Sequence, residues 1–275
     1  MRIAVAAPSF VSGFGAQVFS HLKKSATAGQ SLVECPSPQN SPEVVRARLL
    51  AALEDAPAPA GLIAICFRPD VETIEAYRAR RVPIVLVDEE ADGVSTVAFD
   101  SFAGGHLAGQ HLARAGRRAV AVVAGRMHVN GGYNALQRVK GFAKAMDEAR
   151  APFRIEDVIE VRDYTHRDGV NAMARIREER RTIDAVFSAA GDATATGVLA
   201  AAREQGIRVP EELAIVGYDD SPMAAIADPP LTTVRQSLKA LADEALGIVT
   251  AAPADVLERP VRRLLAPTLV QRRSA

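Results

Sequence analysis

The sequence has no tryptophan and only two cysteines among its 275 residues. Cys35 and Cys66 lack a CxxC spacing and a clustered histidine partner, which predicts two free, half-buried thiols in a reducing compartment rather than a disulfide. The five histidines fit no ligand spacing for a metal ion. We therefore expect neither a metal site nor a disulfide framework.

An excess of charge of either sign is also lacking, because lysine plus arginine and aspartate plus glutamate each number 33. The net charge gives no electrostatic footprint for nucleic acid or for a membrane surface. No apolar run approaches the length of a membrane span, and residues 2–7 are typical of a strand rather than of a secretory signal. These absences predict a soluble, cytoplasmic protein without a membrane partner. A DNA-binding role would require residues outside this chain.

Signatures of catalysis and of cofactor binding are weak or missing. Gly13-Phe14-Gly15 imitates a dinucleotide-binding loop, but residues 8–12 separate it from the first predicted strand, and Val18 stands at the third glycine position. The P-loop, the G-x-S-x-G elbow and the H-E-x-x-H zinc motif are absent. We expect no cofactor, no catalytic residue and no enzymatic activity.

Short runs rich in valine, isoleucine and alanine alternate with amphipathic stretches, a pattern typical of βα units around parallel sheets. The chain is longer than a usual single domain, which favours two lobes. Strands are predicted at 2–7, 32–35, 61–66, 83–87, 95–99, 119–124, 158–161, 185–189 and 213–216. Helices are predicted from Pro42 onward and at 16–28, 71–80, 104–115, 136–149, 167–180, 193–205 and 237–250.

Two adjacent carboxylates follow the last of these strands. Residues 213–216 form a short apolar run, Gly217 lets the backbone turn, and Asp219 and Asp220 then lie at the carboxyl end of the strand. In open parallel sheets this edge is where ligands bind. The alternative is that both aspartates only cap the turn before Pro222.

Several segments of the chain resemble the lactose/galactose repressor (LacI/GalR) family of transcriptional regulators. They are AIVGYDDSP and PPLTTVRQ within 214–236, VAFDSFAGG at 97–105, RVKGFAKAM at 138–146 and LLAPTLVQRRS at 264–274. The similarity extends from residue 1 to the last residues. It implies an α/β fold with two doubly wound parallel-sheet lobes joined by a three-strand hinge, as in type I periplasmic binding proteins.

The same resemblance implies the boundaries and the role of the lobes. Residues 1–115 with 238–265 would form the N-lobe, and residues 116–237 with 266–275 the C-lobe. The chain would be the effector-binding and dimerisation core of a regulator, a homodimer in which ligand-driven lobe closure controls operator DNA binding. An amino-terminal helix-turn-helix, absent from this chain, would contact the DNA.

The resemblance places six residues in the cleft between the lobes: Phe14, Asp88, Arg138, Tyr164, Asp219 and Gln236. Their chemistry suits a carbohydrate, because carboxylates accept from hydroxyl groups, arginine donates to them and aromatic rings cover apolar sugar faces. From the residues alone, the composition favours a solvated surface charge for Arg138, and Tyr164 could be a half-buried ring at a strand end.

Three positions depart from the sugar-binding pattern of the family. Gly15 stands where a second phenylalanine is common, Glu89 where arginine is frequent, and Gly191 where an asparagine precedes the aspartate. These departures put a simple aldopentose in doubt. Two other functions stay open, a stand-alone solute receptor and an enzyme with a doubly wound fold. The codons upstream of Met1 would discriminate between a solute receptor and a regulator.

Overall fold

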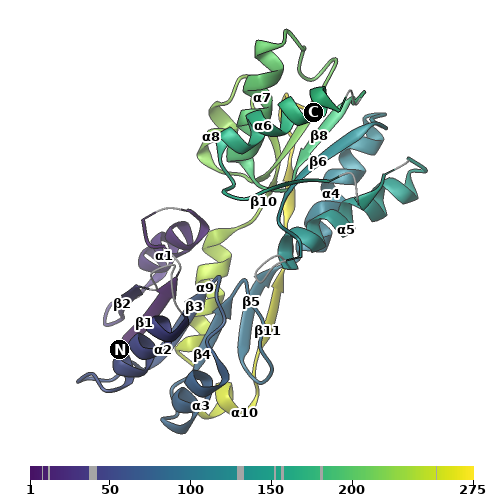
Figure 1. The fold of residues 1–275 in the computed structure, drawn as a ribbon. Helices are drawn as coiled ribbons and strands as arrows, with labels where there is room; N and C mark the ends of the chain where they lie inside the picture. Colours follow the sequence, from purple (N-terminus) through teal and green to yellow (C-terminus); the bar gives the residue numbers. More distant parts are fainter. Residues whose placement is uncertain are drawn as a thin grey trace. The chain divides into compact units, whose positions relative to one another are not determined.

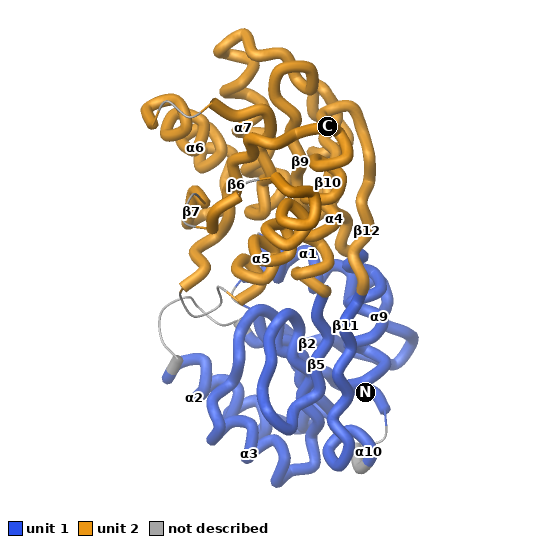
Figure 2. The backbone as a smooth tube through the Cα atoms, turned by 90° about the vertical axis from the view of Figure 1, so that its right-hand side faces the viewer, with its two compact units in different colours: residues 1–99, 237–265 blue, residues 100–236, 266–275 orange. Residues whose placement is uncertain are grey.

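The computed structural model describes residues 1–7, 9–11, 13–36, 42–128, 133–151, 153–155, 158–179, 182–251 and 253–275. The chain divides into two compact units, residues 1–99 with 237–265 and residues 100–236 with 266–275 (Figure 2). It therefore passes from one unit to the other three times. Each unit is a sheet covered by helices on both faces (Figure 1).

Unit 1 is built on a six-stranded sheet in the order β11-β5-β4-β3-β1-β2, and its pairings are parallel. The strands are β1 (Arg2–Ala7), β2 (Ser31–Pro36), β3 (Gly61–Ile65), β4 (Ile84–Val87), β5 (Ser95–Phe99) and β11 (Arg262–Leu265). Every residue of β3 and β4 is buried, as expected for parallel strands covered on both faces.

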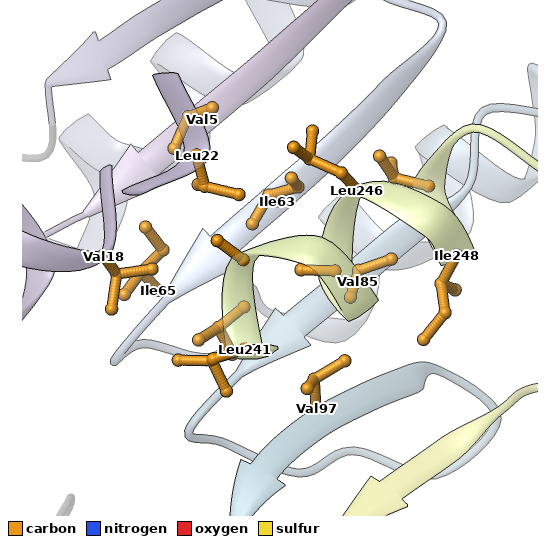
Figure 3. Close-up of a cluster of buried hydrophobic side chains, with 14 of the residues drawn as sticks. Val5, Val18, Leu22, Ile63, Ile65, Val85, Val97, Leu241, Leu246 and Ile248 are labelled. Carbon is orange, nitrogen blue, oxygen red and sulfur yellow. The ribbon is translucent and has the colours of Figure 1, made fainter. Parts of the chain in front are cut away.

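Helices cover both faces of this sheet. Helices α1 (Gly13–Ser25) and α9 (Leu238–Val249) pack on one face, where Val5, Ile63 and Val85 of the strands join Leu22 and Leu241 of the helices (Figure 3). Helices α2 (Pro42–Leu53) and α3 (Val71–Ala79) pack on the other. A short helix, α10 (Pro253–Glu258), precedes β11.

Unit 2 repeats this architecture with the strand order β12-β10-β9-β8-β6-β7, in which only the β10–β12 pairing of the described residues is antiparallel. The strands are β6 (Val120–Gly125), β7 (Ile159–Val161), β8 (Ala185–Ser188), β9 (Ala214–Asp219), β10 (Thr232–Arg235) and β12 (Thr268–Val270). Helices α4 (Ser101–Arg114) and α5 (Tyr133–Glu148) cover one face, and α6 (His166–Glu178) and α7 (Asp192–Glu204) the other. The short helix α8 (Pro222–Ile226) follows β9.

The predicted fold class is confirmed, and the nine predicted strands occur within a few residues of their expected positions. The sequence analysis missed β10, β11 and β12 and the short helices α8 and α10. The missed strands have only three or four residues, and β11 (RRLL) is a largely exposed edge strand. An exposed edge does not need the apolar run that identifies a buried strand.

Helix α4 belongs to unit 2, whereas the sequence analysis had assigned residues up to 115 to the N-lobe. The cause is close packing against α5. A Cβ atom at Gly105 would lie 1.8 Å from the carbonyl oxygen of Arg138, and one at Gly141 would lie 1.9 Å from that of Phe102. Backbone thus contacts backbone, which only glycine permits. Asp100 caps α4, its carboxylate accepting from the N–H of Ala103 at 2.8 Å.

Both cysteines are half-buried, as predicted. Among the helices of the described residues, none has the length and apolar character needed to cross a bilayer.

Candidate functional site

Strained backbone is concentrated at the carboxyl ends of the strands. Seven non-glycine residues in the described ranges have positive φ, and the two outside strand ends, Arg81 and Arg150, follow helices. The other five are Cys66, Asp88, Tyr164, Asp219 and Asp220. Left-handed backbone is unfavourable for such residues and persists where the surroundings enforce it, commonly at functional sites. Three of the six predicted site residues are in this group.

Arg138 of α5 is fixed by two contacts. Its guanidinium carbon lies 3.9 Å from the centre of the Tyr218 ring, a cation–π geometry, and its Nη1 donates to the carbonyl oxygen of Ala189 at 2.9 Å. Burial raises the pKa of both Asp219 and Tyr164, and the positive charge of Arg138 opposes both rises, which places the two side chains within its electrostatic reach. The arginine is therefore a held, half-buried donor rather than a mobile surface charge.

Asp219 is the carboxylate beside this arginine. Burial raises the pKa of the Asp219 carboxyl, and the charge of Arg138 opposes that rise. Within the described ranges, no hydrogen bond or ion pair engages the Asp219 side chain. Gly191, with a φ of 101°, lies against it, and a Cβ atom there would come within 2.8 Å of Asp219 Oδ2. The glycine that departs from the family pattern thus gives the carboxylate its space.

Asp220 is bound differently from its neighbour. Its Oδ2 accepts from Arg235 Nε at 2.5 Å, and its Oδ1 accepts from Arg272 Nη2 at 2.6 Å. The Asp220 side chain is 8% exposed, so both of its oxygens are committed to these ion pairs. Of the two adjacent aspartates, Asp220 has the structural role and Asp219 is the one available to a ligand.

Tyr164 presents its ring and buries its hydroxyl. The residue is 45% exposed, yet the hydroxyl lies over the end of β6, where a Cβ atom at Gly125 would meet it at 1.9 Å. Burial of that end raises the pKa of Tyr164, with Arg138 again opposing the rise. An exposed ring face at a strand end is suited to stacking on a flat apolar face of a ligand.

Asp192, at the start of α7, is a buried acid that the sequence analysis did not single out. It is 1% exposed, its Oδ1 accepts from Thr233 Oγ1 at 2.6 Å, and its Oδ2 accepts from the N–H of Ser221 at 2.6 Å. Burial raises its pKa to about 6 against the lowering effect of these hydrogen bonds, and the nearby Asp219 charge adds to the rise.

The other predicted residues divide between the two units. In unit 2, Gln236 directly follows β10, whose Arg235 lies opposite Asp219, so Gln236 belongs to the same sheet edge. In unit 1, Asp88 directly follows β4 with a φ of 62°. Phe14 of α1 is half-buried and packs against the hydrophobic core of unit 1.

Comparison with known proteins identifies the family. The model of the periplasmic binding protein-like domain matches residues 110–275. The HTH-type transcriptional repressor PurR of Yersinia pestis (strain Pestoides F) is 30% identical over 99% of this chain and 79% of its own length. The chain belongs to the LacI/GalR family of transcriptional regulators. It corresponds to the effector-binding region of such regulators and is not an enzyme.

Solved structures of LacI-family regulators share the fold. The transcriptional regulator CelR in complex with cellobiose is 26% identical, with a TM-score of 0.81 over 100% of this chain and 84% of CelR. The lac repressor dimer bound to operator and an anti-inducer is 23% identical, with a TM-score of 0.84 over 100% of this chain and 93% of that chain. The second likeness concerns the fold alone.

Within the LacI-type fold, the structure brings Arg138, Tyr164 and Asp219 together in unit 2 and leaves Phe14 and Asp88 in unit 1. The sequence analysis missed Tyr218, which holds Arg138, and Asp192. Tyr218 precedes Asp219, and Asp192 follows Gly191, so both adjoin residues that the sequence analysis had considered. The role of Tyr218 depends on the packing of α5 on β9, and that of Asp192 on the pairing of β9 with β10. Neither is visible in local patterns.

Proposed function

We propose that this LacI/GalR-family chain binds a small carbohydrate-like effector through side chains at the carboxyl edges of both sheets. The observation that carries the proposal is the group formed by Arg138, Asp219 and Tyr164 in unit 2. It combines a held donor, an acceptor without a side-chain hydrogen bond in the described part of the chain, and an exposed ring.

These three groups match the chemistry of a polyol. Asp219 accepts hydrogen bonds from vicinal hydroxyl groups, the outer edge of Arg138 donates to ring or hydroxyl oxygens, and the Tyr164 ring covers a C–H face. Asp88, Gln236 and Phe14 would complete the site from the other edge and from the end of β10. The cellobiose complex of CelR supports this class of ligand.

The proposed consequence of binding is closure of the two units on the effector. The intact regulator would be a cytoplasmic homodimer. In it, the closure of the units changes how tightly a DNA-binding head binds the operator. The chain spans 79% of the PurR relative, so the DNA-binding role belongs to the proposal rather than to the residues described here. The balanced charge of the chain agrees with a sensor that does not itself bind DNA.

A thermal-shift panel tests the ligand class with cellobiose, hexoses, pentoses, sugar acids, sugar phosphates and purines. A ligand that binds only the folded protein, at one hundred times its Kd, stabilises it by about 2.7 kcal/mol. For units of this size that corresponds to a rise of about 5–10 °C in Tm. We expect at least one carbohydrate to give this rise. If no compound of the panel raises the Tm and a nucleotide cofactor does, the proposed sensor function is refuted.

Two further measurements test the assembly. Sedimentation at high micromolar concentration is expected to show a dimer, and a species of 29.2 kDa alone would contradict it.

A gel-shift assay at low salt with the promoter of its own gene is expected to show no specific complex with this chain. Saturable, sequence-dependent retardation would assign DNA binding to the described residues instead.

A further inference from the structure

The backbone that carries Asp219 is under strain on two successive residues. Asp219 has a φ of 98° and Asp220 a φ of 54°, and neither is a glycine. Two adjacent left-handed residues persist only when the surrounding structure holds them. The arginines that bind Asp220 restrain the second residue through its side chain. The contacts that restrain the first one must act through the backbone around it.

Asp192 supplies contacts on both sides of Asp219. Its Oδ2 accepts from the N–H of Ser221, two residues after Asp219. Its Oδ1 accepts from Thr233 Oγ1, and Thr233 lies opposite Gly217, two residues before Asp219, in the β9–β10 pairing. One carboxylate therefore spans the segment 217–221 from end to end.

Gly217 is what allows the carboxylate to reach across β9. A Cβ atom at this position would lie 2.3 Å from Asp192 Oδ1 and 3.3 Å from Thr233 Oγ1. Any other residue at 217 would occupy the space in which the Asp192–Thr233 hydrogen bond forms. The sequence thus provides three matched parts, an acid at the start of α7, a glycine in β9 and a hydroxyl group in β10.

We propose that Asp192 is a positioning residue that holds Asp219 in its ligand-binding conformation by tying the N–H of Ser221 to the hydroxyl of Thr233. The proposal rests on the proposed function, because it assigns to Asp219 the recognition of the effector. Asp192 itself does not contact the effector. It acts through the backbone of residues 217–221.

The burial of Asp192 supports this role. A carboxylate that is 1% exposed is unfavourable, and burial raises its pKa to about 6. The charged group that faces it is Asp219 from β9, which raises the pKa further, whereas Thr233 of β10 and Ser221 lower it as hydrogen-bond donors. No cation is among these influences. A shape-filling role at this position would be better served by an uncharged side chain.

The Thr233 hydroxyl connects Asp192 to the strained turn, because it donates to Asp192 Oδ1 at 2.6 Å and accepts from the N–H of Asp220 at 3.4 Å. Substitutions at Thr233 therefore test this link without altering an aspartate. Thr233→Val removes the hydroxyl group with little change of shape, and Thr233→Ser restores it. Thr194→Val is the matched control. Thr194 lies on α7 and is fully buried, as Thr233 is on β10, but its hydroxyl has no hydrogen-bond partner in the described part of the chain. Thr233→Ala replaces Thr233→Val if the valine variant does not fold.

The first readout is the titration of Asp219 in the effector-free chain, followed by carboxyl ¹³C NMR. In Thr233→Val the released carboxylate gains solvent, so its pKa is expected to fall by about half a unit or more relative to wild type. Thr233→Ser and Thr194→Val are expected to titrate as wild type does. An unchanged Asp219 in folded Thr233→Val, or an equal change in Thr233→Ser, overturns the positioning role.

The second readout is calorimetry with cellobiose, ribose and hypoxanthine. Each probe that binds wild type is expected to bind Thr233→Val about tenfold more weakly, the effect of losing one hydrogen bond to a charged group. Equal affinity in the two proteins overturns the proposal. If wild type binds none of the carbohydrates, the proposed ligand class is wrong, and the titration of Asp219 still decides the role of Asp192.

Discussion

The carboxyl edges of the two sheets differ in which predicted ligand-binding side chains they bring together. In unit 2, Arg138 is stacked and hydrogen-bonded, and Asp219 lies in a strained, restrained turn. In unit 1, Phe14 is half-buried against the core, and Asp88 directly follows β4 with a φ of 62°. A preorganised edge loses less conformational freedom on binding. Unit 2 is therefore expected to supply most of the affinity.

The largest expected effect concerns the acid buried at the unit 2 edge. Burial raises the pKa of Asp192 from 3.8 to about 6, so the folded protein binds this proton more tightly than the unfolded chain. The free energy of unfolding should then fall as the pH rises from about 4 to about 6, by up to about 3 kcal/mol. Urea unfolding across this range measures the slope, which Asp192→Asn should reduce by the contribution of Asp192.

Glu89 in unit 1 provides the matched comparison. Burial also raises the pKa of Glu89, but this carboxyl is only half-buried and Arg68 opposes the rise. Glu89→Gln should therefore remove a smaller part of the slope. If the free energy of unfolding depended on pH in the same way in Asp192→Asn and in wild type, the buried Asp192 would not account for a difference in pH dependence between the two edges.

The next effect is the loss of affinity when unit 2 loses its donor or its acceptor. Arg138→Ala and Asp219→Ala should each weaken effector binding about 30- to 100-fold, because each removes a charge-assisted hydrogen bond. Calorimetry with the carbohydrate that gives the largest thermal shift provides the measurement. Asp147→Ala, an exposed acid on the same helix as Arg138, is the control. Both variants binding within about twofold of wild type would show that the site is wrongly assigned.

A smaller effect is expected in unit 1. Asp88→Ala should weaken binding of the same ligand by about tenfold or less, since one hydrogen bond is lost and the Arg138–Asp219 pair of unit 2 stays in place. Calorimetry under the conditions used for Asp219→Ala permits a direct comparison. An Asp88→Ala loss as large as that of Asp219→Ala would break the asymmetry between the edges.

The smallest effect separates the ring of Tyr164 from its hydroxyl. Because the hydroxyl lies over Gly125 and the ring is exposed, Tyr164→Phe should change affinity by less than about twofold and Tyr164→Ala by about fivefold. The ratio of the two Kd values tests ring stacking. Equal losses in both variants would mean that the hydroxyl, not the ring, contacts the effector.

Sequence patterns predicted the fold well because most strands are buried on both faces. Runs such as residues 61–65 and 84–87 are wholly apolar, and the turns after them are marked by charged residues. The edge strand β11 carries two arginines and is largely exposed, so its sequence gives no such signal. The boundary of unit 2 depends on helix packing, which is a contact between distant segments and not a local pattern.

The candidate site was predictable only in part, for a related reason. The family resemblance predicted Asp88, Tyr164 and Asp219, and of these three the position after a predicted strand singled out Asp219 independently. Without the resemblance, the residues alone could not separate Asp219 from Asp220, because the distinction depends on arginines at 235 and 272 that only the fold brings to Asp220. The partners of Asp192 are likewise set by strand pairing, at positions 29 and 41 residues away.

The three passages of the chain between the units also have a consequence for synthesis on the ribosome. Sheet 1 ends with β11 and sheet 2 with β12, and both edge strands come from the last fourteen residues of the chain. The hydroxyl of Ser274 even bonds to the carbonyl oxygen of Ile215 in the middle of unit 2. Neither sheet can be completed before residues 262–270 have been synthesised. A stop codon directly after residue 236 would remove an edge strand from both units at once.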